Sequence, residues 1–190
     1  MIPQQKKRVT PEEYLLFEKD SEIRHEYFDG EIFAMVGARH NHTVISSNIV
    51  RELGNLLKET SCMVFAGDKR IKIEGIEKYT YPDVVVACDK MELLEDELDS
   101  LLNPVVIIEI LSDSTEAYDR GLKFTHYQLI PSLEEYILVS QYSCDITKFK
   151  KINNKNWIYT SYTSIEQSIK IESIACEIPL AEIYYKVKFR

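Results

Sequence analysis

Two short aliphatic runs, residues 81–86 and 105–111, constrain the fold of this 190-residue chain more than any other feature. β-Branched and aliphatic residues follow one another in both, which is typical of strands buried on both faces. Each run nevertheless carries one acid, Asp83 in the first and Glu109 in the second. A bare carboxylate in such a place costs several kcal/mol unless a cation, a proton or hydrogen-bond donors meet it. The two runs therefore predict a partner that both acids share.

A divalent metal held by oxygen ligands is the simplest shared partner for Asp83 and Glu109. The spacing between the acids leaves room for two strands and a connection, so they can be neighbours in one sheet. Mg²⁺, with Mn²⁺ as a substitute, would polarise a phosphoryl group and lower the pKa of a bound water. We expect both acids to be metal ligands. The alternative is that each acid lies at a strand end and faces solvent.

The remaining pattern predicts helices and strands in one domain that spans residues 1–190. Thr10 is an expected N-cap, followed by Pro11 and Glu13, and Asp29-Gly30 predicts a hairpin turn. The expected helices are 41–59 and 116–129, and the expected strands are 62–65 paired with 70–74, then 83–88, 105–111, 135–139, 146–150 and 157–162. This order predicts an α/β or α+β domain with one mixed sheet flanked by helices.

Composition narrows the class of protein without naming a function. No apolar run approaches the roughly 20 residues that span a membrane, and no apolar segment follows the basic residues 6–8 as in a signal peptide. The net charge of −8 argues against a broad basic surface, and part of it comes from the acidic run 91–99, an expected solvated loop or short helix. The four cysteines show no CxxC spacing, so we expect reduced packing residues and a cytoplasmic protein.

The order of several short segments resembles the Uma-type branch of restriction endonucleases in the PD-(D/E)xK nuclease superfamily. The segments with this resemblance are residues 25–31, 42–45, 81–84, 108–112 with 114–115, 119–123 with Tyr127, and 135–136. The resemblance implies a restriction-endonuclease-like fold and a Mg²⁺-dependent phosphodiesterase that acts on DNA. It also implies a homodimer, because relatives with this fold commonly cut two strands with two subunits. The apolar segments 178–180 and 183–185 are candidates for the interface.

One departure from the family pattern concerns the lysine of the ExK motif. The position two residues after Glu109 is Leu111, which can neither orient a water nor neutralise a phosphate. We expect Lys123, on the following helix, to replace the missing lysine, with Arg120 on roughly the same face. The alternative for Lys123 is an i, i+4 pair with Asp119 on a solvated helix face.

Glu26 and His42 are the other candidates for the site. The family resemblance implies that Glu26 assists the metal or orients the water. Without the resemblance, the local sequence predicts a solvated strand residue. His42 could contact phosphate or water in the same cleft. The four histidines lack the spacing of a zinc site, and no glycine-rich loop cradles a nucleotide.

Three functions fit these residues. The first is a Mg²⁺-dependent DNA endonuclease in which Asp83 and Glu109 hold the metal, Lys123 stabilises the phosphate charge and Glu26 assists. The second is a non-catalytic member of the fold, a DNA-binding or assembly module that lost turnover with the ExK lysine. The third is a small-molecule phosphodiesterase, which differs only in the shape of the cleft.

Overall fold

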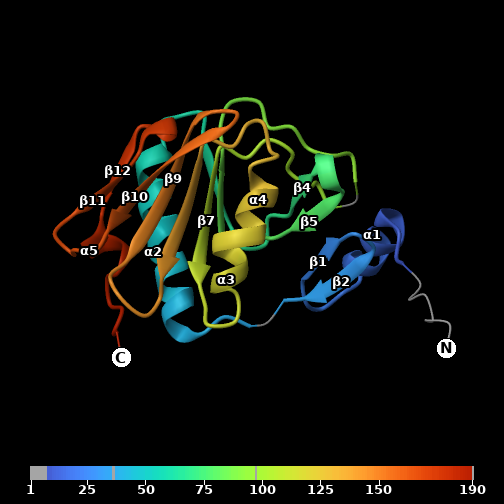
Figure 1. Cartoon of the computed structure of the whole chain (residues 1–190), viewed down its shortest axis with the longest axis horizontal. Coiled ribbons are helices and arrows are strands. Elements are labelled where there is room, and N and C mark those ends of the chain that lie inside the picture. Colours follow the sequence, from blue (N-terminus) through green and yellow to red (C-terminus); the bar gives the residue numbers. More distant parts are fainter. Residues whose placement is uncertain (1–7, 36, 97, 190) are drawn as a thin grey trace.

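A six-stranded mixed sheet forms the centre of the protein, shown in the computed structural model of Figure 1, which describes residues 8–35, 37–96 and 98–189. Its strands lie in the order β10-β9-β8-β7-β6-β3. Their bounds are β3 Met63–Ala66, β6 Val84–Ala87, β7 Val106–Leu111, β8 Glu135–Ser140, β9 Ile146–Asn153 and β10 Asn156–Tyr162. The pair β7–β8 is parallel, and the other neighbours are antiparallel. The expected acid-bearing strands are thus neighbours at the middle of this sheet.

Helices cover both faces of the six-stranded sheet. On one face, α2 (His40–Leu57) packs its residues Ile45, Ile49 and Leu53 against alternate residues of β6, β7 and β8. On the other face lies one helical segment made of α3 (Glu116–Tyr118), η2 (Asp119–Lys123) and α4 (Phe124–Tyr127). Figure 1 shows this segment in yellow, in front of the sheet, with α2 behind it. Tyr127 and the residues after it complete a second core with Val85 and Ile107.

A smaller, four-stranded sheet lies at one end of the molecule in the order β2-β1-β5-β4. Its bounds are β1 His25–Phe28, β2 Glu31–Ala34, β4 Ile71–Ile73 and β5 Lys78–Thr80, and α1 (Pro11–Lys19) packs on it. The side chains of Tyr27 and Tyr79 pack with Tyr14 of α1. Because strand residues alternate, the neighbours of these tyrosines project from the opposite face of the sheet.

Two signals that we expected from the sequence are present in this end of the molecule. Thr10 forms a capping box with Glu13 at the start of α1, and Pro11 occupies the first helical turn. Asp29 and Gly30 have φ angles of 48° and 79°, which is the left-handed conformation that a tight hairpin turn between β1 and β2 requires.

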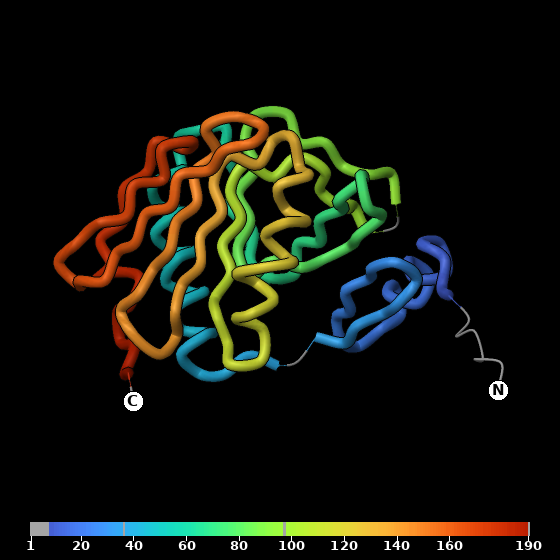
Figure 2. Tube along the Cα trace, viewed as in Figure 1, coloured from blue at the N-terminus to red at the C-terminus, as the bar shows by residue number. Residues whose placement is uncertain are grey.

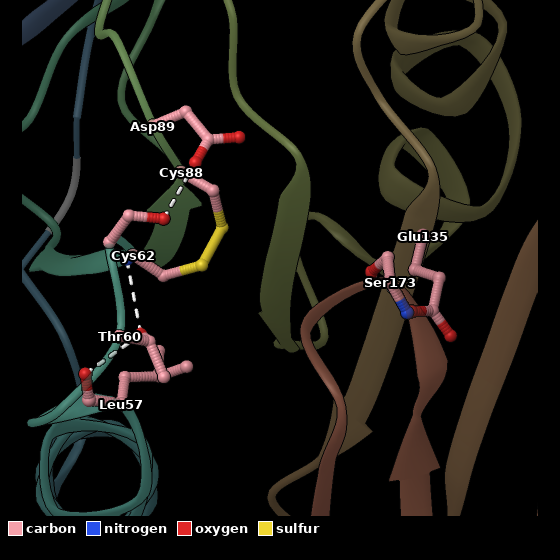
Figure 3. Close-up of a disulfide and its surroundings, with 8 residues drawn as sticks. Leu57, Thr60, Cys62, Cys88, Asp89, Glu135 and Ser173 are labelled. Atoms are coloured by element: carbon pink, nitrogen blue, oxygen red, sulfur yellow. Dashed lines mark hydrogen bonds between the residues drawn. A yellow bond between two sulfur atoms is a disulfide. The ribbon is translucent and has the colours of Figure 1, made fainter.

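A C-terminal hairpin closes the α2 side of the large sheet. It consists of β11 (Ser168–Ile171) and β12 (Cys176–Pro179), followed by α5 (Leu180–Ile183), as the Cα trace of Figure 2 shows in red. Its apolar residues are buried in the same core as α2. Ser173, which follows β11, donates to Glu135 of β8, and both are labelled in Figure 3. In the segments 178–180 and 183–185 only Pro179 and Tyr185 are exposed; the apolar residues Ile178, Leu180, Ile183 and Tyr184 are buried within the chain, so these four are not available for the expected interface.

The expected single sheet is wrong, and so is the expected pairing of strand 62–65 with strand 70–74. The described residues form three sheets, in which β3 pairs with β6 and β4 pairs with β5. Residues 67–70 carry the chain from the large sheet to the small one instead of closing a hairpin. In the acidic run 91–99, Glu92, Glu95 and Asp99 are exposed as expected, but the Asp96 side chain is buried and its carboxylate lies 2.9 Å from the Arg70 guanidinium.

Two of the four cysteines form a disulfide, contrary to the expected reduced state. Cys62 precedes β3 and Cys88 follows β6, and continuing the register Met63↔Ala87 by one pair places them opposite each other. Figure 3 shows this bridge, next to the hydrogen bond from the Cys62 N–H to Thr60. A long-range strand pairing creates this contact, so spacing along the sequence does not indicate it. Cys144 and Cys176 are free, as expected. In the described part of the chain, no helix is long and apolar enough to cross a membrane.

Candidate active site

Asp83 and Glu109 lie on adjacent strands and on the same face of the large sheet. Asp83 immediately precedes β6, and Glu109 lies within β7, one residue after Ile108, the partner of Val84. The Oδ2 atom of Asp83 accepts a hydrogen bond of 2.7 Å from the N–H of Ile110. Both acids line one cavity. This is the arrangement expected from their spacing; Asp83 lies at a strand end with its side chain 20% exposed, whereas the burial of Glu109 contradicts the alternative in which it faces solvent.

The Glu109 carboxylate is almost completely buried, with 4% of the residue exposed. Its Oε1 atom accepts a hydrogen bond of 2.7 Å from the hydroxyl of Tyr127 and lies 2.8 Å from the Nζ atom of Lys123. Leu111, at the position of the missing lysine, is buried in the apolar core on this face. The cation beside Glu109 therefore comes from the helical segment that covers the sheet.

Lys123 is the last residue of η2, a turn of π-helix within the helical segment that covers the sheet. Its Nζ atom also lies 3.4 Å from Asp119 Oδ1 and 3.7 Å from Glu26 Oε1. The expected i, i+4 pair with Asp119 is thus present, but it is buried and not on a solvated face.

Arg120 does not share this face with Lys123, contrary to expectation. A π-turn is wider than an α-turn, so residues three apart no longer line up along the helix. Arg120 instead contacts Glu116 on its own helix and Thr147 of β9.

Glu26 and His42 reach the same cavity from two other elements. Glu26, in β1, accepts a hydrogen bond from the hydroxyl of Thr80 in β5. The Nε2 atom of His42, in the first turn of α2, lies 3.1 Å from Asp83 Oδ2. The five side chains singled out from the sequence thus come from four parts of the fold and meet in one place.

The cavity between these elements has a volume of about 420 Å³. Its polar lining includes Asp83, Glu109, Lys123, Glu26, His42, Tyr118, Asp119 and Gln141, and its apolar lining includes Phe33 and Met35. Both sheets, α2 and the α3–α4 segment contribute to it. A substrate in this cavity would contact carboxylates, an ammonium group and hydroxyl groups within a few ångströms of one another.

The electrostatics of the cavity favour an additional cation. Burial raises the pKa of Glu109, and the Asp83 and Asp119 carboxylates raise it further, although Lys123 opposes this. Burial by itself lowers the pKa of Lys123, but Glu109, Tyr127 and Glu26 reverse this, so that its pKa lies well above the ordinary value. One ammonium group therefore faces three acids, Glu109, Asp119 and Glu26, within 4 Å.

The residues present fit a Mg²⁺ or Mn²⁺ ion held by few protein ligands. Mg²⁺ takes one or two carboxylates and keeps water and phosphate oxygens in its other positions. The buried Asp119 Oδ1 atom has no hydrogen-bond partner among the described residues, and the Lys123 ammonium group, 3.4 Å away, supplies the positive charge that stabilises it. No group of three or more His, Cys, Asp or Glu ligands is arranged for a metal within residues 8–35, 37–96 and 98–189. Asp83 and Glu109, which line the same cavity, are the two carboxylates that would hold such an ion.

Sequence reasoning missed several polar residues around the cavity, namely Lys78, Tyr118, Asp119 as a cavity acid, His126 and the contact of Tyr127 with Glu109. The alternation of side chains along β5 could have indicated Lys78, because Lys78 and Thr80 lie on either side of the buried Tyr79 and so share the opposite face of the strand. Tyr118 and His126 had no local signal, because their approach to Lys78 depends on how the α3–α4 segment docks against the small sheet.

Comparison with known proteins gives three consistent matches. A sequence model of the Uma2 family, described as "Putative restriction endonuclease", matches residues 11–181. The uncharacterized protein slr1290 of Synechocystis sp. is 36% identical over 182 residues, which cover 96% of this chain and 94% of that protein. A second uncharacterized Synechocystis protein, sll1609, is 31% identical over 160 residues, covering 84% and 90% of the two chains.

A solved structure shares the fold at low sequence identity. It is the crystal structure of "a putative nuclease belonging to DUF820" from Anabaena variabilis. It superposes with a TM-score of 0.75 at 17% identity and covers 93% of this chain and 97% of its own. The expected restriction-endonuclease-like α+β fold is thus confirmed.

Proposed function

This chain belongs to the Uma2 family of restriction-endonuclease-like proteins, and from that premise we propose that it is a Mg²⁺-dependent DNA endonuclease. The single observation that carries the proposal is the 2.8 Å contact between Lys123 Nζ and Glu109 Oε1. It supplies, from the helical segment, the cation that Leu111 cannot supply from the strand. The family membership supports a nuclease, and the DNA substrate and the Mg²⁺ ion are our proposals.

In the proposed reaction, Asp83 and Glu109 would hold the metal on the floor of the cavity. The bound ion would polarise the phosphoryl group and generate a nucleophilic water at neutral pH. His42 and the N–H of Ile110 orient the Asp83 carboxylate, and Tyr127 orients that of Glu109. Lys123 offers a positive charge to the phosphate, which Glu109, Asp119 and Glu26 partly compensate before substrate binds. Glu26, 3.7 Å from Lys123, helps to position the ammonium group and would orient the water.

The competing function is a nuclease fold without turnover, which binds DNA or assembles with other proteins. It was plausible from the sequence because the ExK lysine is missing. The buried cluster argues against it, because keeping Lys123, Glu109 and Asp119 together in the interior is costly and serves no evident packing purpose.

Cleavage of supercoiled plasmid and of single-stranded DNA tests the proposed activity. We expect the wild-type protein to cut DNA in Mg²⁺ or Mn²⁺ and to stop cutting in EDTA, because EDTA removes the divalent ion that would polarise the phosphoryl group. Asp83→Asn should reduce the rate by at least about 100-fold, in line with removal of one preorganised electrostatic group. Cleavage that ignores EDTA and the Asp83→Asn change would refute the proposed mechanism.

We also propose that the protein works as a homodimer. A nuclease that cuts both strands of a duplex needs two active sites, and a two-fold dimer supplies them. Light scattering at micromolar concentration should give twice the chain mass of 22.2 kDa. A mass of one chain, in the presence and absence of duplex DNA, would exclude the dimer.

A further inference from the structure

Lys78 is a fully buried lysine close to the cavity that the proposed reaction does not use. It lies in β5, next to Tyr79, whose ring packs on the α1 side of the small sheet. Alternation therefore points Lys78 to the other face, together with Thr80, which hydrogen-bonds to Glu26. This is the face covered by the α3–α4 segment.

Two groups of that segment meet the Lys78 ammonium. Its Nζ atom donates to the hydroxyl oxygen of Tyr118 and lies 3.3 Å from Nδ1 of His126. An ammonium group has three donors and no acceptor, so both partners must accept. His126 is therefore neutral with its proton on Nε2, which agrees with a pKa that burial and the neighbouring Lys78 lower. Burial lowers the pKa of Lys78 to about 8, so it still carries its charge at pH 7.

This contact determines what the Tyr118 hydroxyl can do. Its oxygen already accepts from Lys78, and its single hydrogen remains to be donated. Burial raises the pKa of Tyr118 to about 12, so the hydrogen stays in place at neutral pH. No acceptor for it is found in the described part of the chain, and Tyr118 lines the same cavity as Asp83 and Glu109. The hydroxyl is thus a neutral donor, oriented by a lysine, at the wall of the site.

We propose that Tyr118 donates a hydrogen bond to a non-bridging phosphate oxygen of the bound phosphodiester, and that Lys78 is the positioning residue that orients this donor. The proposal rests on the proposed function and adds a substrate contact to it. Lys123 faces three acids within 4 Å, so much of its charge is compensated before substrate binds. A second donor that carries no charge of its own can bind the phosphate without adding to the cluster of ions.

The variant Tyr118→Phe tests this proposal, since it removes only the hydroxyl group. We expect kcat/KM for bis(p-nitrophenyl) phosphate in Mn²⁺ to fall by about 10- to 100-fold, as for loss of a hydrogen bond to a charged group. Binding of a fluorescein-labelled duplex in Ca²⁺ should weaken by a similar factor. The calorimetric affinity for Mn²⁺ alone should stay the same. The matched control is Tyr159→Phe, on the exposed face of β10, which should change none of these values.

The role of Lys78 is tested by combining substitutions. If Lys78 acts through Tyr118, Lys78→Met should lower kcat/KM by a similar factor, and the double variant should lose nothing further. If Lys78 had a purely structural role, the losses of kcat/KM in the two single variants would instead add up in the double variant. If Lys78→Met does not fold, Tyr118→Phe alone decides the phosphate contact.

The outcomes separate this proposal from the nuclease proposal. Wild-type levels of hydrolysis and duplex binding in Tyr118→Phe would overturn the role of Tyr118 and leave the nuclease intact. A wild-type protein that binds the duplex without cutting it would end the nuclease proposal, while the effect of Tyr118→Phe on binding would still decide the phosphate contact. A wild-type protein that neither binds nor cuts would overturn both.

Discussion

Replacing Lys123 by methionine is expected to slow DNA cleavage by about 1000-fold while the protein keeps its ability to bind Mn²⁺. The ammonium group is the cation closest to Glu109, and preorganised charges of this kind commonly contribute 100- to 1000-fold to the rate. Methionine preserves most of the buried volume. Because Lys123 neutralises Glu109, its removal should leave Mn²⁺ affinity unchanged or higher. Rates of plasmid cleavage and calorimetric titration with Mn²⁺ measure the two effects.

Arg120→Met is the matched control for Lys123→Met. Arg120 lies three residues earlier in the same helical segment, carries the same charge and contacts Glu116 and Thr147 away from the cavity. We expect it to cut within about two-fold of the wild-type rate, since exposed ion pairs contribute little. Equal losses in both variants would indicate a general effect of charge on DNA binding and would contradict a specific role of Lys123.

The second large effect is expected from Glu109→Gln, which should weaken Mn²⁺ binding by roughly 100-fold or more. The change removes one of the two carboxylates that we propose as ligands, and hard divalent cations depend on charged oxygen ligands. The amide keeps the size of the side chain, and it can still accept from Tyr127. Calorimetric titration with Mn²⁺ gives the affinity directly.

An exposed acid far from the cavity provides the comparison for Glu109→Gln. Glu182 lies in α5 and pairs with Arg51 at 3.5 Å, and Glu182→Gln removes the same charge from the protein. Its Mn²⁺ affinity should equal that of the wild type. If Glu109→Gln bound Mn²⁺ as tightly as Glu182→Gln, Glu109 would not be a metal ligand.

The parts of the fold that depend on local residues could be predicted from the sequence. The capping box at Thr10 and the turn at Asp29-Gly30 satisfy backbone requirements within a few residues. The two apolar runs likewise predicted the central strands β6 and β7, because a short run of aliphatic residues is itself the local signal of a buried strand. The division into two larger sheets could not be read in this way. Whether β3 pairs with β4 or β6 depends on the docking of whole sheets, and the Cys62–Cys88 disulfide follows from that choice.

The residues of the candidate site could be predicted where they departed from an expected sequence pattern. Asp83 and Glu109 stood out as acids in apolar strands, and Leu111 marked a missing cation, so a lysine from the next helix was the natural replacement. The structure places Lys123 there, at the end of a π-helical turn that the sequence pattern does not predict. Tyr118 and Lys78 were not found, because each has an ordinary neighbourhood in the sequence and becomes notable only through contact with the other.

A crystal of the wild-type protein soaked in Mn²⁺ tests the central claim most directly, because anomalous diffraction locates the ion. The account predicts one peak in the cavity, bound by carboxylate oxygens of Asp83 and Glu109 at roughly 2.0–2.6 Å. At the same Mn²⁺ concentration, the peak should be much weaker in crystals of Glu109→Gln. A cavity without an anomalous peak at saturating Mn²⁺, with Lys123 still paired to Glu109, would contradict a metal-dependent nuclease at this site.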